Sequence, residues 1–414
     1  MIISQATQDF IRDHANDDPR RLALKGTKNP EVDLNVALQQ IAGLQTARQK
    51  LPSWAATEGI VYPPHLSMEQ CSSEQTSRYK AQLLHQAPST QIHPQSTLLD
   101  LTGGFGVDFS FMAQGFAQAF YVEQQPTLCD IARHNFPLLG LVSAQVVCGD
   151  GMDFLRQTKQ HFDWIYIDPA RRDAQGGRTY GISDCTPNVL DMLDLLKEKA
   201  DHILLKLSPM LDWRKAIQDL GEDLVSEVHI VSVGNECKEL LVVLEVGGRN
   251  LAIREYLVNC VNLQPNGTAE TFVIGRNNSP TPHLLPSTSH LSPLTTKYLY
   301  EPNASIMKAG CFAELCERYG VSQVAQNSHL FIFADFIEKF PGRKFQIEAV
   351  LTMNKRELKE KLRGLSQANI TVRNFPMTVA ELRKRLKLTD GGDTYIFATT
   401  LADETHVLFV CHRV

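Results

Sequence analysis

Hydrophobic and polar positions follow three different patterns along this chain of 414 residues. Up to about residue 90, apolar side chains recur at roughly helical spacing, at Val36, Leu38, Ile41, Leu44 and Leu51. Three prolines interrupt this stretch, Pro52, Pro63 and Pro64. The pattern therefore predicts a helical N-terminal region.

One more helix is expected over Ser67–Lys80. Ser67 and Gln70 stand at the spacing of a capping box, in which the two side chains bond reciprocally to the backbone of the first turn. The helix leads into the next part of the chain. It either lies over a ligand site there or packs on a sheet as a structural element.

From residue 97 the pattern alternates between short apolar runs and amphipathic segments. The alternation predicts strands at 97–101, 119–123, 144–148, 163–167 and 202–207, with helices such as Thr127–Leu139 and Val189–Ala200 between them. A regular β-α-β-α order is typical of a parallel, doubly wound sheet. The predicted class of this part is therefore α/β.

The end of the alternating part is different. Val228–Val233 and Leu240–Val246 are apolar runs joined by a short polar loop, Gly234–Lys238. Such a pair predicts a hairpin, so the last strand should run antiparallel to its neighbours. A dinucleotide-binding fold has two βαβαβ halves that are entirely parallel, so this layout differs from it.

The remaining third of the chain mixes strands and helices. A short β region is expected at 250–275, followed by a Pro- and Ser-rich linker at 277–293 and a helix ending at Tyr319. Further strands are expected at 329–333, 346–351, 370–373, 394–399 and 406–411, with helices at 354–364 and 377–387. The order indicates small α+β units.

Composition narrows the setting. Hydrophobic residues make up 43% of the chain and charged residues 21%, with a net charge of -5, which indicates a globular protein that is not coated with positive charge. No apolar run approaches the ~20 residues of a membrane span, and the N-terminus lacks the features of a signal peptide. The 9 cysteines and 13 histidines show no CxxC or HExxH spacing. We therefore expect a cytoplasmic protein without a metal site.

Candidate chemistry begins at the first predicted strand. Leu98-Leu99-Asp100 leads into Leu101-Thr102-Gly103-Gly104-Phe105-Gly106, where three glycines in four positions allow a sharp turn against a ligand. An acidic residue follows each of the first four strands: Asp100, Glu123, Asp150 and Asp168. The carboxyl ends of parallel strands meet at one edge, so the four acids should share a crevice.

Taken singly, these acids have ordinary structural explanations. Asp100 could be a helix N-cap, Glu123 a solvated strand end, and Asp150 a cap for the helix that starts near Met152. A pyrophosphate-binding loop is disfavoured, because Phe109 stands where the fingerprint requires Gly or Ala. The joint pattern favours a ligand site.

Over residues 97–246, the four acids and the closing hairpin resemble the class I S-adenosylmethionine (SAM)-dependent methyltransferases. The resemblance implies that Asp100, Thr102, Gly103, Gly104 and Gly106 wrap the methionine part of SAM. It implies that Glu123 binds both ribose hydroxyls, since a carboxylate can accept two hydrogen bonds from a diol. It places Asp150, Gly151 and Met152 at the adenine ring.

The loop after the fourth strand, Asp168-Pro169-Ala170-Arg171-Arg172, would face the methyl group and the substrate. We expect catalytic roles for Asp168, Pro169 and Arg171, and substrate contacts from Arg172, Arg178 and Lys206. The loop has one proline and no aromatic residue, unlike the motif of exocyclic-amine methyltransferases. Arginines suit an anionic substrate, although Arg171 or Arg172 could pair with Asp173, and Lys206 with Asp168.

Enzymes that methylate C5 of RNA pyrimidines need a nucleophilic cysteine near the fourth or fifth strand. Cys185 is the candidate by position, and a structural cysteine is the favoured interpretation.

Residues 341–387 carry a concentration of positive charge. There are 12 Lys or Arg residues against four Glu, a difference of +8 within a chain of net charge -5. Either a nucleic-acid-binding face or two solvated helices would explain it. The β-α-β-α-β-β order with basic helices looks like a THUMP-type RNA-binding module. With Asp168-Pro169-Ala170-Arg171 and Glu301-Pro302-Asn303, the chain resembles bacterial methyltransferases that carry a THUMP-like domain.

The predicted fold is thus a Rossmann-like methyltransferase sheet, closed by an antiparallel hairpin, between a helical N-terminal region and small α+β C-terminal domains. The expected domains are a helical domain (1–90), the methyltransferase domain (91–250), a linker with a ferredoxin-like α+β region (251–340), and a THUMP-like domain (341–414).

The function expected is methylation of structured RNA, either tRNA or rRNA, gripped through 341–387. Two alternatives remain: a methyltransferase for a small molecule or protein whose C-terminal domain serves oligomerisation, and a non-catalytic RNA- or SAM-binding protein.

Overall fold

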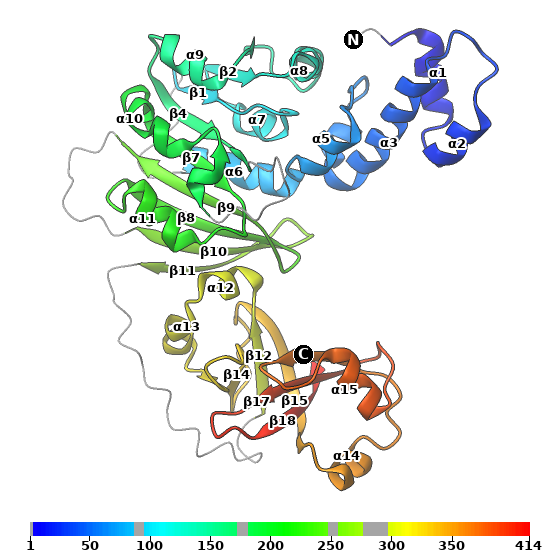
Figure 1. Ribbon diagram of the computed structural model, residues 1–414, viewed down its shortest axis with the longest axis vertical. Helices are drawn as coiled ribbons and strands as arrows, with labels where there is room; N and C mark the ends of the chain where they lie inside the picture. Colours follow the sequence, from blue (N-terminus) through cyan, green and yellow to red (C-terminus); the bar gives the residue numbers. More distant parts are fainter. Residues whose placement is uncertain (1–2, 87–94, 172–180, 247–255, 276–296) are drawn as a thin grey trace. The chain divides into compact units, whose positions relative to one another are not determined.

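The computed structural model describes residues 3–86, 95–171, 181–246, 256–275 and 297–414, with the side chain of Arg171 outside the description (Figure 1). The chain forms two compact units. The first comprises Met1–Val228 with Glu239–Tyr256, and the second His229–Lys238 with Leu257–Val414. Each unit is described by itself.

The first unit begins with helices, as predicted. They are α1 (Gln5–Asp13), α2 (Pro19–Lys25), α3 (Leu34–Lys50), α4 (Pro52–Ala55), α5 (His65–Gln70) and α6 (Glu74–Gln86). None of the helices in the described ranges has the length and apolar character needed to cross a bilayer.

The capping box predicted at Ser67 is wrong. Ser67 lies inside α5, whose N-cap is Pro64 without a side-chain cap. The expected helix over 67–80 is divided instead, because Cys71 is extended and α6 starts anew at Glu74. Ser73 Oγ accepts the backbone N–H of Thr76 at the start of this second helix.

The N-terminal helices share a hydrophobic core with the helices that follow. Trp54 is fully buried and its ring lies 4.9 Å from that of Phe105. The side-chain amide of Asn135 binds both the N–H and the carbonyl of Val61, at 2.9 Å each. Residues 51–86 are therefore built into the same core as the glycine turn.

The strands of the first unit follow the predicted alternation closely. They are β1 (Thr97–Asp100), β2 (Gln118–Glu123), β3 (Ala144–Cys148), β4 (Phe162–Ile167) and β7 (Ala200–Leu207). The intervening helices are α7 (Val107–Met112), α8 (Pro126–Leu138), α9 (Gly151–Gln157), α10 (Val189–Lys199) and α11 (Trp213–Leu220). A short ladder, β5 (Ala170–Arg171) with β6 (Cys185–Thr186), and a 3₁₀ turn at Ile182–Asp184 follow β4.

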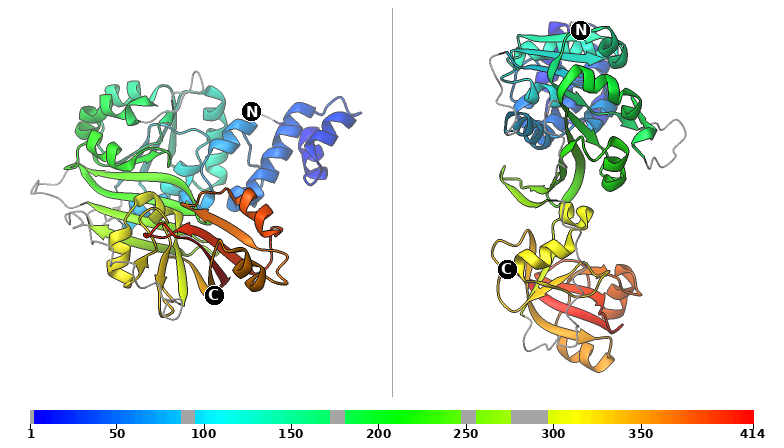
Figure 2. Two further views of the ribbon diagram at one scale, coloured as in Figure 1. Left: turned by 60° about the horizontal axis from the view of Figure 1, so that its bottom comes forward. Right: turned by 90° about the vertical axis from the view of Figure 1, so that its left-hand side faces the viewer.

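The order of strands in space is β8-β9-β7-β4-β1-β2-β3, and β7, β4, β1, β2 and β3 pair in parallel. Chain order reverses between β1 and β4, which makes this the switch point where open α/β sheets bind ligands. Helix α10 contacts both α9 and α11, and α6 contacts α7. Figures 1 and 2 show the arrangement of the helices around the sheet. Right-handed crossovers place α7 on the opposite face of the sheet from α9 and α10.

The predicted hairpin is present as β8 (Val225–Val233) and β9 (Glu236–Glu245). β9 runs antiparallel to β7, as expected for the last strand. The tip of the hairpin, 229–238, belongs to the second unit, where β8 is followed in the sheet by β10 (Leu257–Leu263) and β11 (Ala269–Gly275). The described part of the predicted β region at 250–275, residues 256–275, thus contains β10 and β11.

The second unit also contains a sheet in the order β13-β14-β12-β15-β18-β17-β16. Its elements are β12 (Tyr298–Pro302), α12 (Ala304–Ala309), α13 (Phe312–Tyr319), β13 (Ser322–Gln323), β14 (Phe331–Phe333), β15 (Gly342–Thr352), α14 (Lys355–Lys361), β16 (Asn369–Arg373), α15 (Val379–Leu386), β17 (Thr394–Thr400) and β18 (His406–Arg413). The β-α-β-α-β-β order predicted for the tail is confirmed from β15 onward. The predicted linker at 277–293 lies outside the described residues.

The side chains of Leu358 on α14 and Leu382 on α15 join one hydrophobic cluster with Ile370, Ile396 and Leu408 of the sheet. Both helices therefore cover the same face of this sheet. Their remaining faces carry polar and charged residues of the segment 341–387.

Candidate functional site

The glycine turn connects β1 to α7 beneath the side chain of Tyr121. A Cβ atom on Gly103 would lie 2.3 Å from the Tyr121 ring, so only glycine fits there. Gly106 is the N-cap of α7 and has a φ of 85°, in the left-handed region that favours glycine. The turn is thus fixed by two requirements for glycine.

Asp100 is buried at the end of β1, with 1% of its surface exposed. Its carboxylate accepts the backbone N–H of Thr102 at 2.9 Å. Burial raises the pKa of Asp100 well above its ordinary value, the Thr102 N–H opposes this, and Asp108, Asp168 and Glu123 add to the rise. Asp100 does not cap α7, whose N-cap is Gly106, so that structural explanation is wrong.

Glu123 is also buried, at 7% exposure, and is not a solvated strand end. One carboxylate oxygen accepts the N–H of Gly104 at 2.8 Å and the other that of Gln125 at 2.7 Å. Glu123 therefore ties the glycine turn to the end of β2. Each oxygen keeps a second lone pair that can accept a further hydrogen bond.

Asp150 is exposed and is the N-cap of α9. One oxygen accepts the N–H groups of Met152 at 2.8 Å and Asp153 at 3.1 Å. The capping role considered from the sequence is therefore present. A Cβ on Gly151 would lie 2.4 Å from the carbonyl oxygen of Leu101, so α9 starts directly against the glycine turn.

The loop after β4 is tied to the same turn. The backbone N–H of Asp168 donates to Thr102 Oγ1 at 2.7 Å, and Pro169 is buried. Arg171 pairs through its backbone with Cys185, within the β5–β6 ladder. Arg172 and Arg178, the predicted substrate contacts, lie outside the described residues.

Cys185 is buried, with 2% of its surface exposed. This agrees with its interpretation as a structural cysteine.

Lys206 pairs with Asp168, the alternative considered for it from the sequence. Its Nζ atom lies 2.6 Å from Oδ2 of Asp168 and 3.7 Å from Oδ2 of Asp108. Burial acts to lower the pKa of Lys206, but the carboxylates of Asp168, Asp108 and Glu239 outweigh it and raise the pKa. These carboxylates therefore favour the protonated ammonium over the neutral amine.

Sequence reasoning missed the residues behind this pair. Asp108, on the first turn of α7, accepts the hydroxyl groups of Ser72, Ser77 and Tyr166 at 2.8, 2.6 and 2.8 Å. Lys80 of α6 is completely buried, and its Nζ atom lies 3.2 Å from Asp108 and 2.7 Å from Glu239. These partners are far apart in sequence, and a lysine in a polar helix ordinarily indicates a solvated position.

The pKa of Asp108 follows from these contacts. Burial acts to raise it, but the ammonium groups of Lys80 and Lys206 and the hydroxyls of Ser77 and Ser72 hold it well below its ordinary value. Asp108 is therefore an anion at neutral pH.

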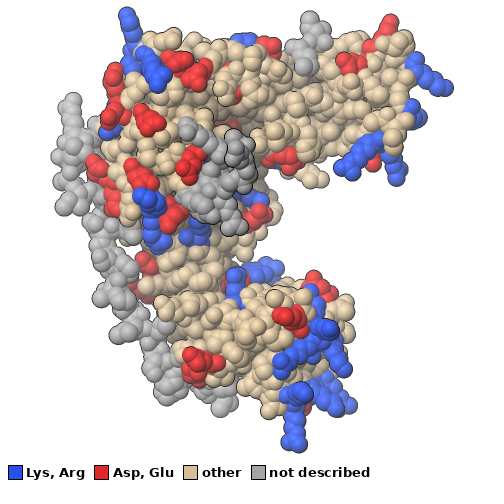
Figure 3. Space-filling model, in the orientation of Figure 1, with Lys and Arg blue, Asp and Glu red and all other residues tan. Residues whose placement is uncertain are grey.

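The 12 basic residues of 341–387 fall into two groups. Arg343, Lys344, Arg373 and Arg383 are partly buried and bonded: the first and third to Glu301, Lys344 to the carbonyl of Glu338, and Arg383 to Asp390. The other eight are exposed on α14, α15 and the turns after them: Lys355, Arg356, Lys359, Lys361, Arg363, Lys384, Arg385 and Lys387. Figure 3 shows Lys and Arg side chains gathered over α14 and α15. We call these eight residues the basic face.

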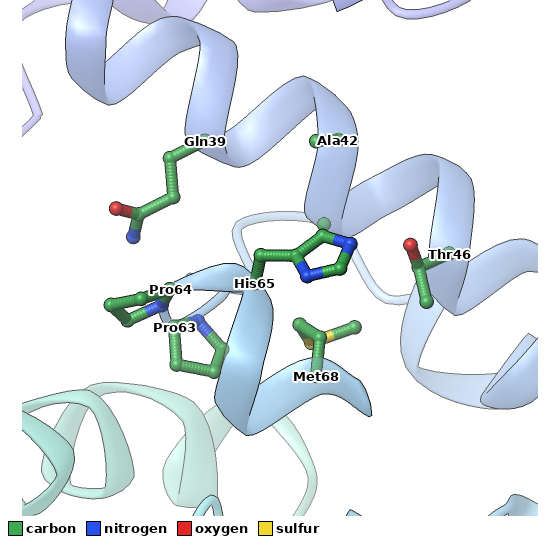
Figure 4. A pocket seen from close by; sticks show the side chains of 8 residues that line it. Gln39, Ala42, Thr46, Pro63, Pro64, His65 and Met68 are labelled. Carbon is green, nitrogen blue, oxygen red and sulfur yellow. The ribbon is translucent and has the colours of Figure 1, made fainter. Parts of the chain in front are cut away.

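A small pocket lies elsewhere in the first unit, between α3 and α5 (Figure 4). Its volume is about 230 Å³, and Gln39, Thr46 and Met68 are among the residues that line it. None of the predicted site residues does. Within the described ranges, no group of three or more His, Cys, Asp or Glu side chains is placed to hold a metal ion.

The chemistry of the crevice suits SAM. Asp100, Glu123 and Asp150 supply acceptors for hydroxyl and amine hydrogens, and the backbone around Gly104 is open, since a Cβ there would have its nearest neighbour at 3.8 Å. The acidic side chains at this edge of the sheet would repel a phosphate group. SAM carries no phosphate group, so this repulsion does not affect it.

Comparisons with known proteins find family matches for the C-terminal part of the chain and a similar structure that covers all of it. The family described as "THUMP domain-like" matches residues 342–413, and a family described as "ferredoxin-like domain" matches residues 298–341. The crystal structure of a "putative methyltransferase" from Porphyromonas gingivalis W83 is 32% identical, covers 100% of both chains and has a TM-score of 0.83.

A curated relative matches a shorter segment. Ribosomal RNA small subunit methyltransferase J of Coxiella burnetii (strain Dugway 5J108-111) is 28% identical over 149 residues. The match takes in 32% of this chain and spans 58% of that relative's length.

Proposed function

Because this chain belongs to the family of SAM-dependent methyltransferases that carry a C-terminal THUMP-like domain, we propose that it is a class I enzyme that methylates structured RNA, either tRNA or rRNA. We further propose that it acts in the cytoplasm. The division into a helical domain (1–90), a methyltransferase domain (91–250), a ferredoxin-like region (251–340) and a THUMP-like domain (341–414) is part of this proposal.

The observation that carries the RNA proposal is the basic face. Its eight cations are all exposed, and no ion pair engages them within the described part of the chain. The sequences of α14 and α15, KRELKEK and VAELRKRL, contain no aromatic residue on which a base could stack. A cationic face without stacking groups suits the phosphates of folded RNA, which position an RNA without reading its bases.

The cofactor would be held at the carboxyl edge of the sheet. In this proposal Asp100, Thr102, Gly103, Gly104 and Gly106 surround its methionine part, Glu123 binds the ribose hydroxyls, and Asp150, Gly151 and Met152 border the adenine. When bound, SAM supplies a methyl group that is already activated by the sulfonium.

The protein's own contribution would then be orientation. Asp168 and Pro169 lie at the end of β4, beside the turn, and would align the substrate atom, while Arg171, Arg172 and Arg178 would bind its anionic parts. Lys206 would hold Asp168 in place rather than contact the substrate directly. The ion pair with Lys206 would fix the position of Asp168, which suits Asp168 to orienting an acceptor group.

The test uses the full chain and cellular RNA. Mass spectrometry of nucleosides from a deletion strain and its parent should reveal one methylated nucleoside that is lost, and purified protein with labelled SAM should restore it. Lys359→Glu with Lys384→Glu should weaken RNA binding and reduce the salt slope by about 2, one unit for each lost phosphate contact.

Lys25→Glu, at the end of α2, with Lys28→Glu, in the exposed loop that follows, is the matched control for net charge. Equal weakening by both pairs would contradict the assignment of RNA binding to the basic face. Identical nucleoside profiles in the two strains would contradict RNA as the substrate.

A further inference from the structure

Five charged side chains alternate in sign through the first unit: Glu239, Lys80, Asp108, Lys206 and Asp168. Successive members are bridged at 2.7, 3.2, 3.7 and 2.6 Å. We call this set the charge ladder. Its inner end is inaccessible to water, and its outer end, Asp168, stands where β4 meets the glycine turn.

The inner charges of the ladder are almost completely buried, so their partners are protein groups. The side chains of Lys80 and Glu239 are 0% and 3% exposed, and that of Asp108 is 12% exposed. Buried charges cost free energy unless they are well paired, and here each has an opposite charge on both sides or a double contact. Lys80 donates to both oxygens of Glu239, at 2.9 and 2.7 Å, and to Ser72 Oγ at 3.2 Å.

The ladder has an uneven charge. Three carboxylates and two ammonium groups leave one net negative charge, and water does not screen its inner members. The outer members are less deeply buried, since the side chains of Lys206 and Asp168 are 14% and 36% exposed. The excess negative charge therefore acts electrostatically beside Asp168, where the proposed function puts the reacting methyl group.

We propose that the charge ladder determines the preference of the crevice for the cationic methyl donor over its neutral product, with Lys80 and Asp108 acting as positioning residues through Lys206 and Asp168. SAM carries a positive sulfonium, whereas S-adenosylhomocysteine (SAH) has a neutral thioether at the same place. A ladder with a net negative charge attracts the positive sulfonium of SAM and has no such attraction for the neutral thioether of SAH. This inference rests on the proposed SAM site.

Substitutions of the neighbouring buried residues Asp108 and Lys80 should change the preference for SAM in opposite directions. Asp108→Asn leaves the ladder neutral, so the ratio of the SAH to the SAM dissociation constant should fall by about three- to tenfold. Lys80→Met leaves two excess negative charges, so the same ratio should rise by about that factor. The double variant regains the wild-type charge and should regain the wild-type ratio. A purely structural role would lower both affinities together and leave the ratio unchanged.

The experiment is calorimetric titration of the full chain with SAM and with SAH at low salt. Lys206→Met and Asp168→Asn test the same signs at partly exposed positions, where a substitution is better tolerated, in case Lys80→Met does not fold. The inference is overturned if the Asp and Lys variants shift the ratio in the same direction, or if every variant stays within twofold of wild type.

A further variant separates the cofactor site from the charge ladder. Glu123→Ala should weaken SAM and SAH alike, which tests the cofactor site itself. A wild-type chain that binds neither ligand overturns the proposed site and this inference together. An unchanged ratio in variants that bind both ligands overturns the ladder alone.

Discussion

The backbone N–H of Gly104 donates to Oε2 of Glu123 at 2.8 Å, across the gap between the ends of β1 and β2. The second oxygen of Glu123 accepts the N–H of Gln125 at 2.7 Å. The acid proposed to bind the ribose therefore also holds the shape of the glycine turn. Its substitution should affect both the turn and the cofactor.

Glu123→Gln keeps the size of the side chain but removes its charge. We expect the dissociation constant for SAM to rise by about ten- to a hundredfold, since hydrogen bonds to charged groups contribute about 1.5–3 kcal/mol. Calorimetric titration measures this directly. Glu58→Gln, on an exposed turn, is the matched control and should bind as wild type does. Equal affinities of the wild type and Glu123→Gln would remove Glu123 from the cofactor site.

Gly103→Ala places a methyl group against the Tyr121 ring, at 2.3 Å. Tyr121 is fully buried and its hydroxyl donates to the carbonyl of Gly104, so the ring cannot move aside freely. We expect a loss of stability of about 1–3 kcal/mol, the usual cost of overpacking, together with weaker SAM binding. Urea unfolding and titration measure the two effects.

Gly104→Ala is the comparison for that variant. Its Cβ would meet nothing nearer than 3.8 Å, and its strain comes from a φ of 56°. The expected cost is about 1–2 kcal/mol of left-handed backbone strain without a clash. If Gly103→Ala leaves SAM binding at the wild-type level, the close contact with Tyr121 has no bearing on the site.

The sequence predicts the first unit well because its signals are local. Buried strands such as Leu98–Leu99 and the glycines after them need only neighbouring residues to be recognised. The acid at each strand end follows from the parallel topology. The closing hairpin was visible for the same reason, from two apolar runs and a five-residue polar loop.

What could not be predicted depends on contacts between distant residues. Lys80 and Glu239 are 159 positions apart, and neither stands in a recognisable motif. Ser67 fits a capping box by spacing, yet the backbone starts its helix earlier, at His65. The net charge of 341–387 likewise does not distinguish exposed basic residues from paired ones, whereas in the structure Arg343 and Arg373 neutralise the buried Glu301.

Asp100 gives the protein a pH dependence whose sign can be worked out. Burial raises its pKa in the folded state above the unfolded value of about 3.9. The folded protein therefore holds this proton more tightly than the unfolded chain does. The resulting stabilisation is complete below the unfolded pKa and is lost as the pH rises through the folded pKa.

Asp100→Asn imitates the protonated acid at every pH. We expect its melting temperature to exceed that of the wild type by a margin that grows between pH 4 and pH 8. Thermal unfolding at several pH values measures this margin. Asp130→Asn, at a largely exposed position on α8, should show no such growth. A margin for Asp100→Asn that stays constant or shrinks as the pH rises would contradict the raised pKa.

Glu301 joins the two matched regions of the second unit. It lies on β12, its side chain is 3% exposed, and its two oxygens bind Arg343 of β15 and Arg373 of β16, the latter at 2.9 Å. Both arginine side chains are 36% exposed and can regain water if the acid is removed. Glu301→Gln should therefore cost about 2–3 kcal/mol, somewhat below the usual 3–5 for breaking a fully buried pair.

Urea unfolding of the full chain, followed by a probe in the second unit, tests this estimate. Glu338→Gln is the matched control on an exposed site of the same unit and should change stability by less than about 0.5 kcal/mol. A cycle with Arg373→Met isolates the pair, because the second substitution should cost less once Glu301 is already lost. Strictly additive losses would show that Glu301 and Arg373 do not stabilise each other. RNA affinity should fall less in Glu301→Gln than in the charge reversals of the basic face, since the eight exposed cations remain in place.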